Sequence, residues 1–339
     1  MRAPLREIVV RVVYPLLPAD DLRLRCDLDW GRDVLPAATS ADREVTTFRF
    51  AAAGPFHYFK PILFRGGEPH WAQSNNYLAF GGDREIYPYF FGDHSCSARE
   101  LKSLGDGEGR HEYRVFDPPG YEENTLKRYP VLYMQDGQNV FFPHEAFGGN
   151  SWRIGETLAL LDQMNAIDKL IVVAVYPKNR GREYTRPGYG EYGRFLVEQL
   201  KPRIDAEFRT LRGPESTAVM GSSLGGVVSF YLAWQYPQVF GMAACMSSTF
   251  GYRDDLRERV AGEAKRSISI YLDSGWPGDN YEVTRDLRTL LVQRGYDEGR
   301  DLDYLAFPEA MHNEHFWALR AHIPIQLLFG RPRRRPNLP

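Results

Sequence analysis

The chain has 339 residues, of which 43% are hydrophobic and 25% are charged, a balance typical of a globular protein with one large and one smaller domain. Its net charge of −2 gives no general attraction to nucleic acid, so we expect no nucleic-acid partner. The three cysteines are widely spaced, and we find neither a signal peptide nor a membrane-spanning apolar run, so we expect reduced thiols, no membrane contact and a cytoplasmic protein.

Residues 1–90 are expected to form a small β-sandwich, because short segments with strand patterns are separated by turn residues. Four segments carry this pattern: Leu22–Trp30, Val45–Phe50, Phe56–Phe64 and His70–Phe80. In the first segment alternate residues are apolar, and we expect them to face inward: Leu22, Leu24, Cys26, Leu28 and Trp30.

Four aromatic residues of this region have two candidate roles. Trp30, Phe59, Trp71 and Tyr77 could stack on a sugar or aryl group, or they could pack inside the sandwich. Aromatic side chains in such domains more often fill the core, so packing is the favoured interpretation.

The rest of the chain changes character. Residues 91–111 mix aromatic residues with a polar, glycine-containing end, and we interpret them as a linker between domains. Residues 112–330 alternate predicted strands with predicted helices, which favours a mainly parallel sheet covered on both faces. The strands are expected at 112–118, 131–136, 170–177, 218–220, 242–247, 268–273 and 302–308, and the helices at 152–164, 192–208, 281–293 and from about 315. Residues 331–339 form a basic tail.

The segment from Thr217 to Pro237 predicts a strand, a sharp turn and a helix. Its turn contains the pattern G-x-S-x-G, in which a strained backbone lifts one serine out of the sheet and presents it at a helix N-terminus. Ser223 is therefore the candidate nucleophile. Gly221 and Gly225 leave room where the elbow brings backbone together. The N–H of Leu224 has no intrahelical acceptor and can donate to an oxyanion.

A serine nucleophile needs a base and an acid later in the chain. His312 follows the predicted strand 302–308 before a helix has begun, so it is the candidate base, whereas His315 is expected to open that helix. Asp273 ends the preceding strand, and Asp279 lies in the loop that leads from it into a helix. We favour Asp279 because its loop can reach across to the histidine, but Asp273 stays open.

The loop after the strand 131–136 is expected to complete the oxyanion hole. There Gly137 supplies a turn, and we choose the N–H of Gln138 as the second donor. Asp136 is expected to brace this turn.

Substrate contacts are the least specific part of the pattern. Arg182, which lies between Arg180 and Arg186, could meet an anionic substrate or stay in ion pairs of a solvated loop. Trp152 and Trp276 could line an acyl or aryl pocket, or could simply pack.

Six motifs follow one another in one order: FDPPGY, RYPVLYMQDGQNVF, REYTRPGY, TAVMGSSLGG, YLDSGWPGDNY and MHNEHFW. Together they resemble the esterase D and enterochelin esterase (Fes-like) family of α/β-hydrolases, over residues 98–330. The resemblance implies Ser223 as nucleophile, His312 as base in a His-Asn-Glu type motif, and Asp279 as acid, in a loop one residue longer than the family's Gly-x-x-Asp. On its DLDW and YFKPILF stretches, the N-terminal region is similar to the sandwich domain that precedes the hydrolase in enterochelin esterases.

We therefore predict an α/β-hydrolase fold preceded by a small all-β sandwich domain. The predicted function is that of a serine carboxylester hydrolase, which acts through an acyl-enzyme on a small-molecule, siderophore or sugar/aryl ester and needs no metal or organic cofactor. An acyltransferase on the same residues and a non-catalytic glycan-binding protein on a hydrolase scaffold stay open as alternatives, as does a homodimer.

Overall fold

The computed structural model describes residues 5–80, 83–92, 95–107 and 110–330. The chain divides into two compact units. The first contains Met1–Ser95, Pro118–Arg128 and Ala159–Ala166, and the second contains Cys96–Asp117, Tyr129–Leu158 and Ile167–Pro339. The basic tail expected at 331–339 lies outside the described residues.

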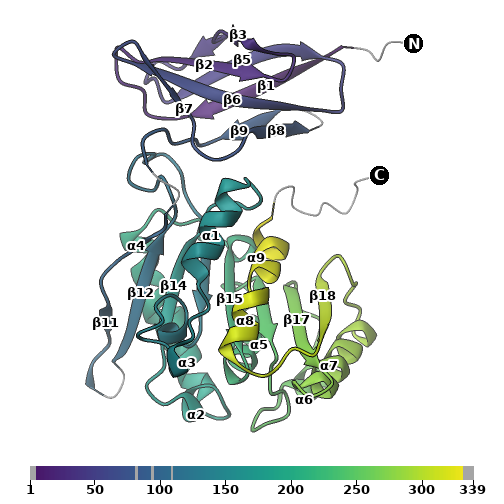
Figure 1. The fold of residues 1–339 in the computed structure, drawn as a ribbon. Helices are drawn as coiled ribbons and strands as arrows, with labels where there is room; N and C mark the ends of the chain where they lie inside the picture. The colour runs from purple at the N-terminus through teal and green to yellow at the C-terminus, as the bar shows by residue number, and fades with distance from the viewer. Residues whose placement is uncertain (1–4, 81–82, 93–94, 108–109, 331–339) are drawn as a thin grey trace. The chain divides into compact units, whose positions relative to one another are not determined.

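The first unit contains two sheets that share one core. One sheet has the order β4-β5-β1-β9, and the other has the order β3-β2-β6-β7 with β8 paired to β6 (Figure 1). The strands are β1 Arg6–Val13, β2 Asp21–Cys26, β3 Asp29–Val34, β4 Ala38–Thr39, β5 Val45–Ala52, β6 Phe56–Arg65, β7 Glu68–Trp71, β8 Tyr77–Phe80 and β9 Arg84–Ile86. Apolar side chains from both sheets, among them Val10, Leu24, Phe48 and Phe59, pack in a single cluster, as in a β-sandwich.

The expected strand Leu22–Trp30 is wrong, because it is a hairpin. β2 ends at Cys26 and β3 begins at Asp29, so the inward alternation stops at Cys26. Leu28 is 51% exposed and Trp30 is 38% exposed. Asp27 stabilises the turn by accepting hydrogen bonds from the Tyr58 N–H at 2.9 Å and from the His57 ring at 2.8 Å.

The aromatic residues of this unit divide between core and surface. Phe59 and Tyr77 stack on each other inside the core, with ring centroids 5.8 Å apart. Trp30 and Trp71 are partly exposed. Phe59 and Tyr77 therefore pack in the core, as expected for aromatic residues of a β-sandwich.

The second unit is built on a nine-stranded sheet of order β10-β12-β14-β13-β15-β16-β17-β18, with β11 also paired to β12. Its strands are β10 Ser97–Ala98, β11 Lys102–Leu104, β12 His111–Asp117, β13 Val131–Met134, β14 Ile171–Tyr176, β15 Thr217–Ser222, β16 Met242–Met246, β17 Ser269–Trp276 and β18 Leu302–Pro308. β10, β11 and β14 are antiparallel to β12, and all pairs from β14 to β18 are parallel. β10 and β11 thus occupy part of the segment 91–111.

Helices cover this sheet. They are α1 Ile154–Gln163, α2 Arg180–Glu183, α3 Tyr189–Phe195, a π-helical turn Leu196–Leu200, α4 Lys201–Glu207, α5 Leu224–Gln235, α6 Leu256–Gly262, α7 Tyr281–Gln293, α8 Glu314–Arg320 and α9 His322–Phe329. Figure 1 shows α8 and α9 on the near face of the sheet and α4 behind it. Every residue of β13, β15 and β16 is buried, because helices exclude water from both faces.

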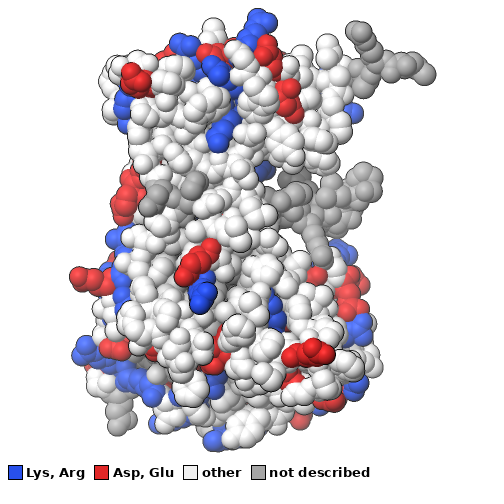
Figure 2. Space-filling view, in the orientation of Figure 1, with Lys and Arg blue, Asp and Glu red and all other residues white. Residues whose placement is uncertain are grey.

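The parallel direction of β13 to β18 brings the loops after these strands to one edge of the sheet. Ligands of such sheets bind at this edge. Within the described parts of the chain, no helix is long and apolar enough to cross a membrane. On the face drawn in Figure 2, acidic and basic side chains are interspersed, as the small net charge suggests.

Candidate active site

Ser223 sits on a strained turn between β15 and α5. Its backbone has φ 54° and ψ −123°, which few residues other than glycine adopt. A Cβ atom on Gly221 would lie 2.5 Å from the backbone of Gly225, so this elbow closes only with glycine. The Ser223 N–H donates to the carbonyl of Met246 in the neighbouring strand at 2.9 Å, which ties the elbow to the sheet. The expected strand, turn and helix are all present.

His312 and Asp279 lie beside this serine. The Nε2 atom of His312 is 2.9 Å from Ser223 Oγ, and its Nδ1 atom is 2.5 Å from Asp279 Oδ1. His312 belongs to the loop between β18 and α8, and Asp279 to the loop between β17 and α7. The side chain of His312 is 37% exposed, whereas that of Asp279 is 1% exposed. The rings of Trp317 and His312 pack edge to face with their centroids 5.0 Å apart, which limits movement of the imidazole.

Asp279 is held in place by further donors. Its Oδ2 atom accepts hydrogen bonds from the Gly275 N–H at 2.9 Å and from the hydroxyl of Ser247. Burial by itself would raise the pKa of Asp279, but the hydrogen bonds from His312 and Ser247 outweigh it and hold this pKa below its usual range. The carboxylate is therefore ionised where it meets the imidazole.

Asp273, the other candidate acid, points elsewhere. It is fully buried and accepts hydrogen bonds from Arg320 at 3.1 and 3.2 Å and from the Tyr271 hydroxyl at 2.8 Å. Burial raises the pKa of Asp273, and Arg320 offsets this only in part. Of the two aspartates, Asp279 is the one that contacts His312.

The loop after β13 lies against the elbow. Asp136 adopts a left-handed conformation with φ 55°, and Gly137–Asn139 forms a 3₁₀ turn that contains Gln138. A Cβ atom on Gly225 would lie 3.0 Å from Asp136 Oδ2, which shows how closely loop and elbow approach. On the other side of the elbow, Leu224 is the first residue of α5.

The three predicted substrate contacts lie in different settings. Trp152 is 2% exposed, and its ring centroid is 6.0 Å from that of Trp317. Trp276, the last residue of β17, is 48% exposed. Arg182 lies on the surface in an ion pair of 3.0 Å with Glu191.

Several residues of the site are not among those predicted from the sequence, although Trp317 ends the motif MHNEHFW. Ser247, Trp317 and Arg320 contact Asp279 or its neighbours, and they lie 32 to 73 residues from their partners. Arg180 forms an ion pair with Asp136, whereas the sequence left it open between a substrate contact and an ion pair within a solvated loop. The spacing of Trp317 and Arg320 on one helix face was the only local signal.

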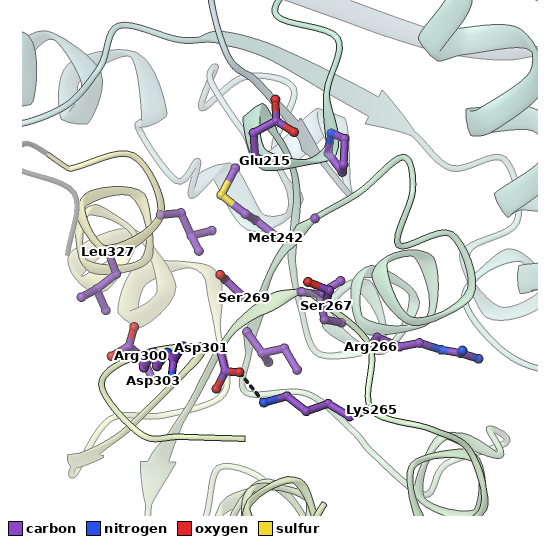
Figure 3. A pocket seen from close by; sticks show the side chains of 15 residues that line it. Glu215, Met242, Lys265, Arg266, Ser267, Ser269, Arg300, Asp301, Asp303 and Leu327 are labelled. Carbon is purple, nitrogen blue, oxygen red and sulfur yellow. Dashed lines mark hydrogen bonds and ion pairs between the residues drawn. The ribbon is translucent and has the colours of Figure 1, made fainter. Parts of the chain in front are cut away.

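A pocket of about 720 Å³ lies at the opposite edge of the sheet, where β16, β17 and β18 begin (Figure 3). Its lining includes Met242, Ser269 and Asp303 and none of the candidate residues. Lys265 is paired with Asp301 in it, at 2.6 Å. Among the described residues, no group of three or more His, Cys, Asp or Glu side chains is arranged to hold a metal ion.

The chain matches a family model and is similar to a bacterial protein. The family model described as "Putative esterase" matches residues 108–317. The uncharacterized protein YbbA of Bacillus subtilis (strain 168) is 22% identical over 249 residues, which are 66% of this chain and 95% of that protein.

Two solved structures have a similar fold. A ferulic acid esterase superposes with a TM-score of 0.58 and 16% identity, over 69% of this chain and 98% of that one. The enterobactin esterase FES from Shigella flexneri, determined in the presence of 2,3-di-hydroxy-N-benzoyl-glycine, superposes with a TM-score of 0.53 and 12% identity, over 96% of this chain and 93% of that one. The α/β-hydrolase fold with an N-terminal β-sandwich is thereby confirmed.

Proposed function

The chain belongs to the Esterase family of carboxylic ester hydrolases, and we propose that Ser223, His312 and Asp279 carry its reaction as nucleophile, base and acid. The observation that supports this proposal is the unbroken row of hydrogen bonds from Ser223 Oγ through the imidazole to the buried carboxylate. The resemblance to Fes-like esterases is confirmed by the family match, which sets aside a non-catalytic glycan-binding protein.

In the proposed reaction Ser223 Oγ attacks the carbonyl carbon of the ester, and His312 Nε2 takes the hydroxyl proton. Asp279 holds the Nδ1–H of the imidazole, so that Nε2 carries the lone pair and the imidazolium is stabilised when it forms. The bond to the alcohol then breaks, and His312 returns the proton to the leaving oxygen. A water molecule attacks the acyl-enzyme with the same base, which releases the acid and restores Ser223.

The negative charge on the carbonyl oxygen needs donors that are already in place. We assign this role to the N–H groups of Leu224 and Gln138. Leu224 begins α5, where backbone N–H groups have no intrahelical acceptor. Gln138 belongs to the turn that lies against the elbow, and the ion pair between Arg180 and Asp136 braces this turn.

For the substrate we propose an ester with an aryl acyl group, as in a siderophore or an aryl-substituted sugar. The names of the two structural neighbours include ferulic acid, enterobactin and 2,3-di-hydroxy-N-benzoyl-glycine, and an ester derived from any of these compounds has an aryl ring in its acyl part. Trp276 is half exposed at the end of β17, next to the loop that holds Asp279, and can stack on such a ring.

Two further substrate contacts belong to this proposal. Trp152 Nε1 is buried and makes no hydrogen bond in the described part of the chain, and we propose that it donates to a bound acyl group. Arg182 is 65% exposed and lines a pocket of about 620 Å³, where it can meet an anionic part of the substrate. We also propose that residues 1–90 and 112–330 are separate domains. The two compact units agree with this division except at Pro118–Arg128 and Ala159–Ala166, which belong to the first unit.

A panel of esters tests this function. The panel contains p-nitrophenyl acetate, a feruloyl ester, a 2,3-dihydroxybenzoyl ester and an acetylated sugar. Each ester is assayed with wild type and with Ser223→Ala. We expect the highest kcat/KM for the two aryl acyl groups and no turnover by the variant. Adding sugar or alcohol acceptors separates hydrolysis from acyl transfer, because a transferase would form the new ester in place of the free acid. Equal rates for all acyl groups would contradict the aryl assignment.

A further inference from the structure

A charged cluster is buried directly behind Asp279. Arg320, the last residue of α8, is 4% exposed, and its Nε and Nη2 atoms donate to the two oxygens of Asp273 at 3.2 and 3.1 Å. Nη2 also donates to Ser247 Oγ and lies 3.4 Å from Asp279 Oδ2. One guanidinium therefore contacts both buried aspartates.

The charges of this cluster do not cancel without Arg320. Asp273 and Asp279 are 0% and 1% exposed, and the charged or titratable side chains that face them in the described part of the chain are those of His312, Arg320, Tyr271 and the buried thiol Cys245. The remaining described donors to the two aspartates are neutral: the hydroxyl of Ser247 and the backbone N–H groups of Ser247 and Gly275. Two carboxylates in one buried site cannot both ionise unless a cation is near, because like charges in a medium of low polarity repel strongly.

The cluster also determines the direction of the Ser247 hydrogen bond. A serine hydroxyl has one proton and two lone pairs. Its oxygen accepts from Arg320 Nη2 and from Trp317 Nε1, the latter at 3.0 Å. Both lone pairs are occupied, so the Ser247 proton goes to Asp279 Oδ2. With the Gly275 N–H also on Oδ2, the free oxygen Oδ1 is the one that meets His312.

We propose that Arg320 is a positioning residue for ester hydrolysis, which neutralises Asp273 and thereby keeps Asp279 ionised and aimed at His312. This inference rests on the proposed function of Ser223, His312 and Asp279. Arg320 touches neither the substrate nor the imidazole, so it acts through Asp279. α8 begins two residues after His312 and places Trp317 and Arg320 on one face, so the segment that supplies the base also fixes the acid.

Four variants separate charge from packing: Arg320→Met, Arg320→Lys, Asp273→Asn and the double variant Asp273→Asn/Arg320→Met. Each is assayed on p-nitrophenyl acetate from pH 5 to pH 9, next to wild type and Ser223→Ala, and its folding is followed by circular dichroism. For Arg320→Met we expect kcat to fall about 100-fold with little change in KM, since a displaced acid misaligns the base but not the bound ester.

The dependence of kcat/KM on pH shows whether the loss of activity comes from the missing charge of Arg320 or from altered packing. Removing a cation makes proton uptake by its neighbours easier, so the acid limb of kcat/KM moves to higher pH in Arg320→Met. Arg320→Lys keeps the charge but not the forked geometry, so its acid limb stays near that of wild type while kcat falls about tenfold. The double variant removes the cation together with the carboxylate that it neutralises, so most of kcat and the position of the acid limb return.

Several results would overturn the inference. The inference is wrong if Arg320→Met has the same pH profile and the same kcat as wild type. It is also wrong if the double variant is unfolded or is no more active than Arg320→Met. If Arg320→Met does not fold, the double variant decides by the same criterion. Turnover that persists in Ser223→Ala contradicts the proposed function itself, whereas an inactive Ser223→Ala beside an unaffected Arg320→Met contradicts only the role of Arg320.

Discussion

Arg180 and Asp136 join the two loops that meet at Ser223. The guanidinium of Arg180 donates to both carboxylate oxygens of Asp136, at 2.8 and 3.0 Å, and also lies 3.4 Å from the carbonyl oxygen of Ser222. The Asp136 N–H donates to the hydroxyl of Tyr184 at 3.0 Å. The turn that carries Gln138 is therefore connected to the elbow through Arg180, which pairs with Asp136 across 44 positions and also contacts the carbonyl of Ser222.

Replacing Arg180 should loosen this turn. Arg180→Met leaves the Asp136 carboxylate, which is 3% exposed, without its cation. Breaking a fully buried pair costs about 3–5 kcal/mol, and because the side chain of Arg180 is 36% exposed we expect a smaller loss, about 1–3 kcal/mol, in the free energy of unfolding. We also expect kcat to fall about tenfold or more as the oxyanion donor moves.

Urea unfolding and ester kinetics check this prediction. The matched control is Arg300→Met, since Arg300 is 67% exposed and its ion pair with Asp297 is 3.6 Å long. The control should change the free energy of unfolding by less than about 0.5 kcal/mol. Equal behaviour of the two variants would mean that the pair with Asp136 does not brace the turn.

Gly221 should not tolerate a side chain. In Gly221→Ala the new Cβ would lie 2.5 Å from the backbone of Gly225, which cannot move without opening the elbow. We expect the free energy of unfolding to fall by about 1–3 kcal/mol and ester turnover to be lost. Gly262→Ala is the control, because a Cβ there meets no atom within 4 Å. Thermal unfolding of both proteins gives the comparison, and a stable, active Gly221→Ala would refute the close approach.

The two buried aspartates should affect stability with opposite dependence on pH. The pKa of Asp279 is lowered because the hydrogen bonds from His312 and Ser247 outweigh the effect of burial. The contribution of Asp279 to stability is therefore present above 3.8, its pKa in the unfolded chain, and is lost as the pH falls through its pKa in the folded protein. Burial raises the pKa of Asp273, so its contribution is present below 3.8 and is lost as pH rises through the folded pKa.

Unfolding free energies of wild type, Asp279→Asn and Asp273→Asn between pH 2.5 and pH 7 check these signs. Relative to wild type, Asp279→Asn should become less destabilising as the pH falls below about 3.8. Asp273→Asn should become more favourable as the pH rises above it. Parallel curves for all three proteins would contradict both pKa shifts.

Trp276 should matter for aryl esters only. Because its side chain is 48% exposed, Trp276→Ala should leave the fold intact. Loss of one aromatic stack, worth about 0.5–1.5 kcal/mol, should raise KM for a feruloyl ester about 2- to 12-fold and leave KM for an acetyl ester unchanged. Leu319→Ala, at a residue that is 60% exposed on α8, is the control. An equal rise in KM for both esters would exclude an aryl contact.

Much of the hydrolase unit could be predicted from local patterns. β18 has the bounds expected from its apolar run, and α7 has the bounds expected from its amphipathic spacing. The N-terminal unit was less predictable. The alternation that begins at Leu22 continues through the turn at Asp27 and Leu28, so periodicity alone could not show that the chain reverses there.

Some residues of the candidate site could be predicted from the sequence, and others could not. Ser223 lies in a local pattern, and fold order points to His312. The sequence favoured Asp279 but left Asp273 open, because Asp273 lies in the strand β17 and Asp279 in the loop after it. The contacts that separate them are those of His312 with Asp279 and of Arg320 with Asp273. Arg320 and Ser247 lie 73 residues apart and meet only in the folded chain, so no spacing along the sequence could identify them.

The central claim is that the Ser223 hydroxyl is the nucleophile. Wild type is treated with a fluorophosphonate probe and digested, and the site of the adduct is read by mass spectrometry, with Ser223→Ala and Ser222→Ala treated in parallel. We predict one phosphonyl group on Ser223 in wild type and in Ser222→Ala, with loss of p-nitrophenyl ester turnover in step with labelling, and neither label nor turnover in Ser223→Ala. An adduct on another residue, or undiminished turnover by Ser223→Ala, would contradict the mechanism.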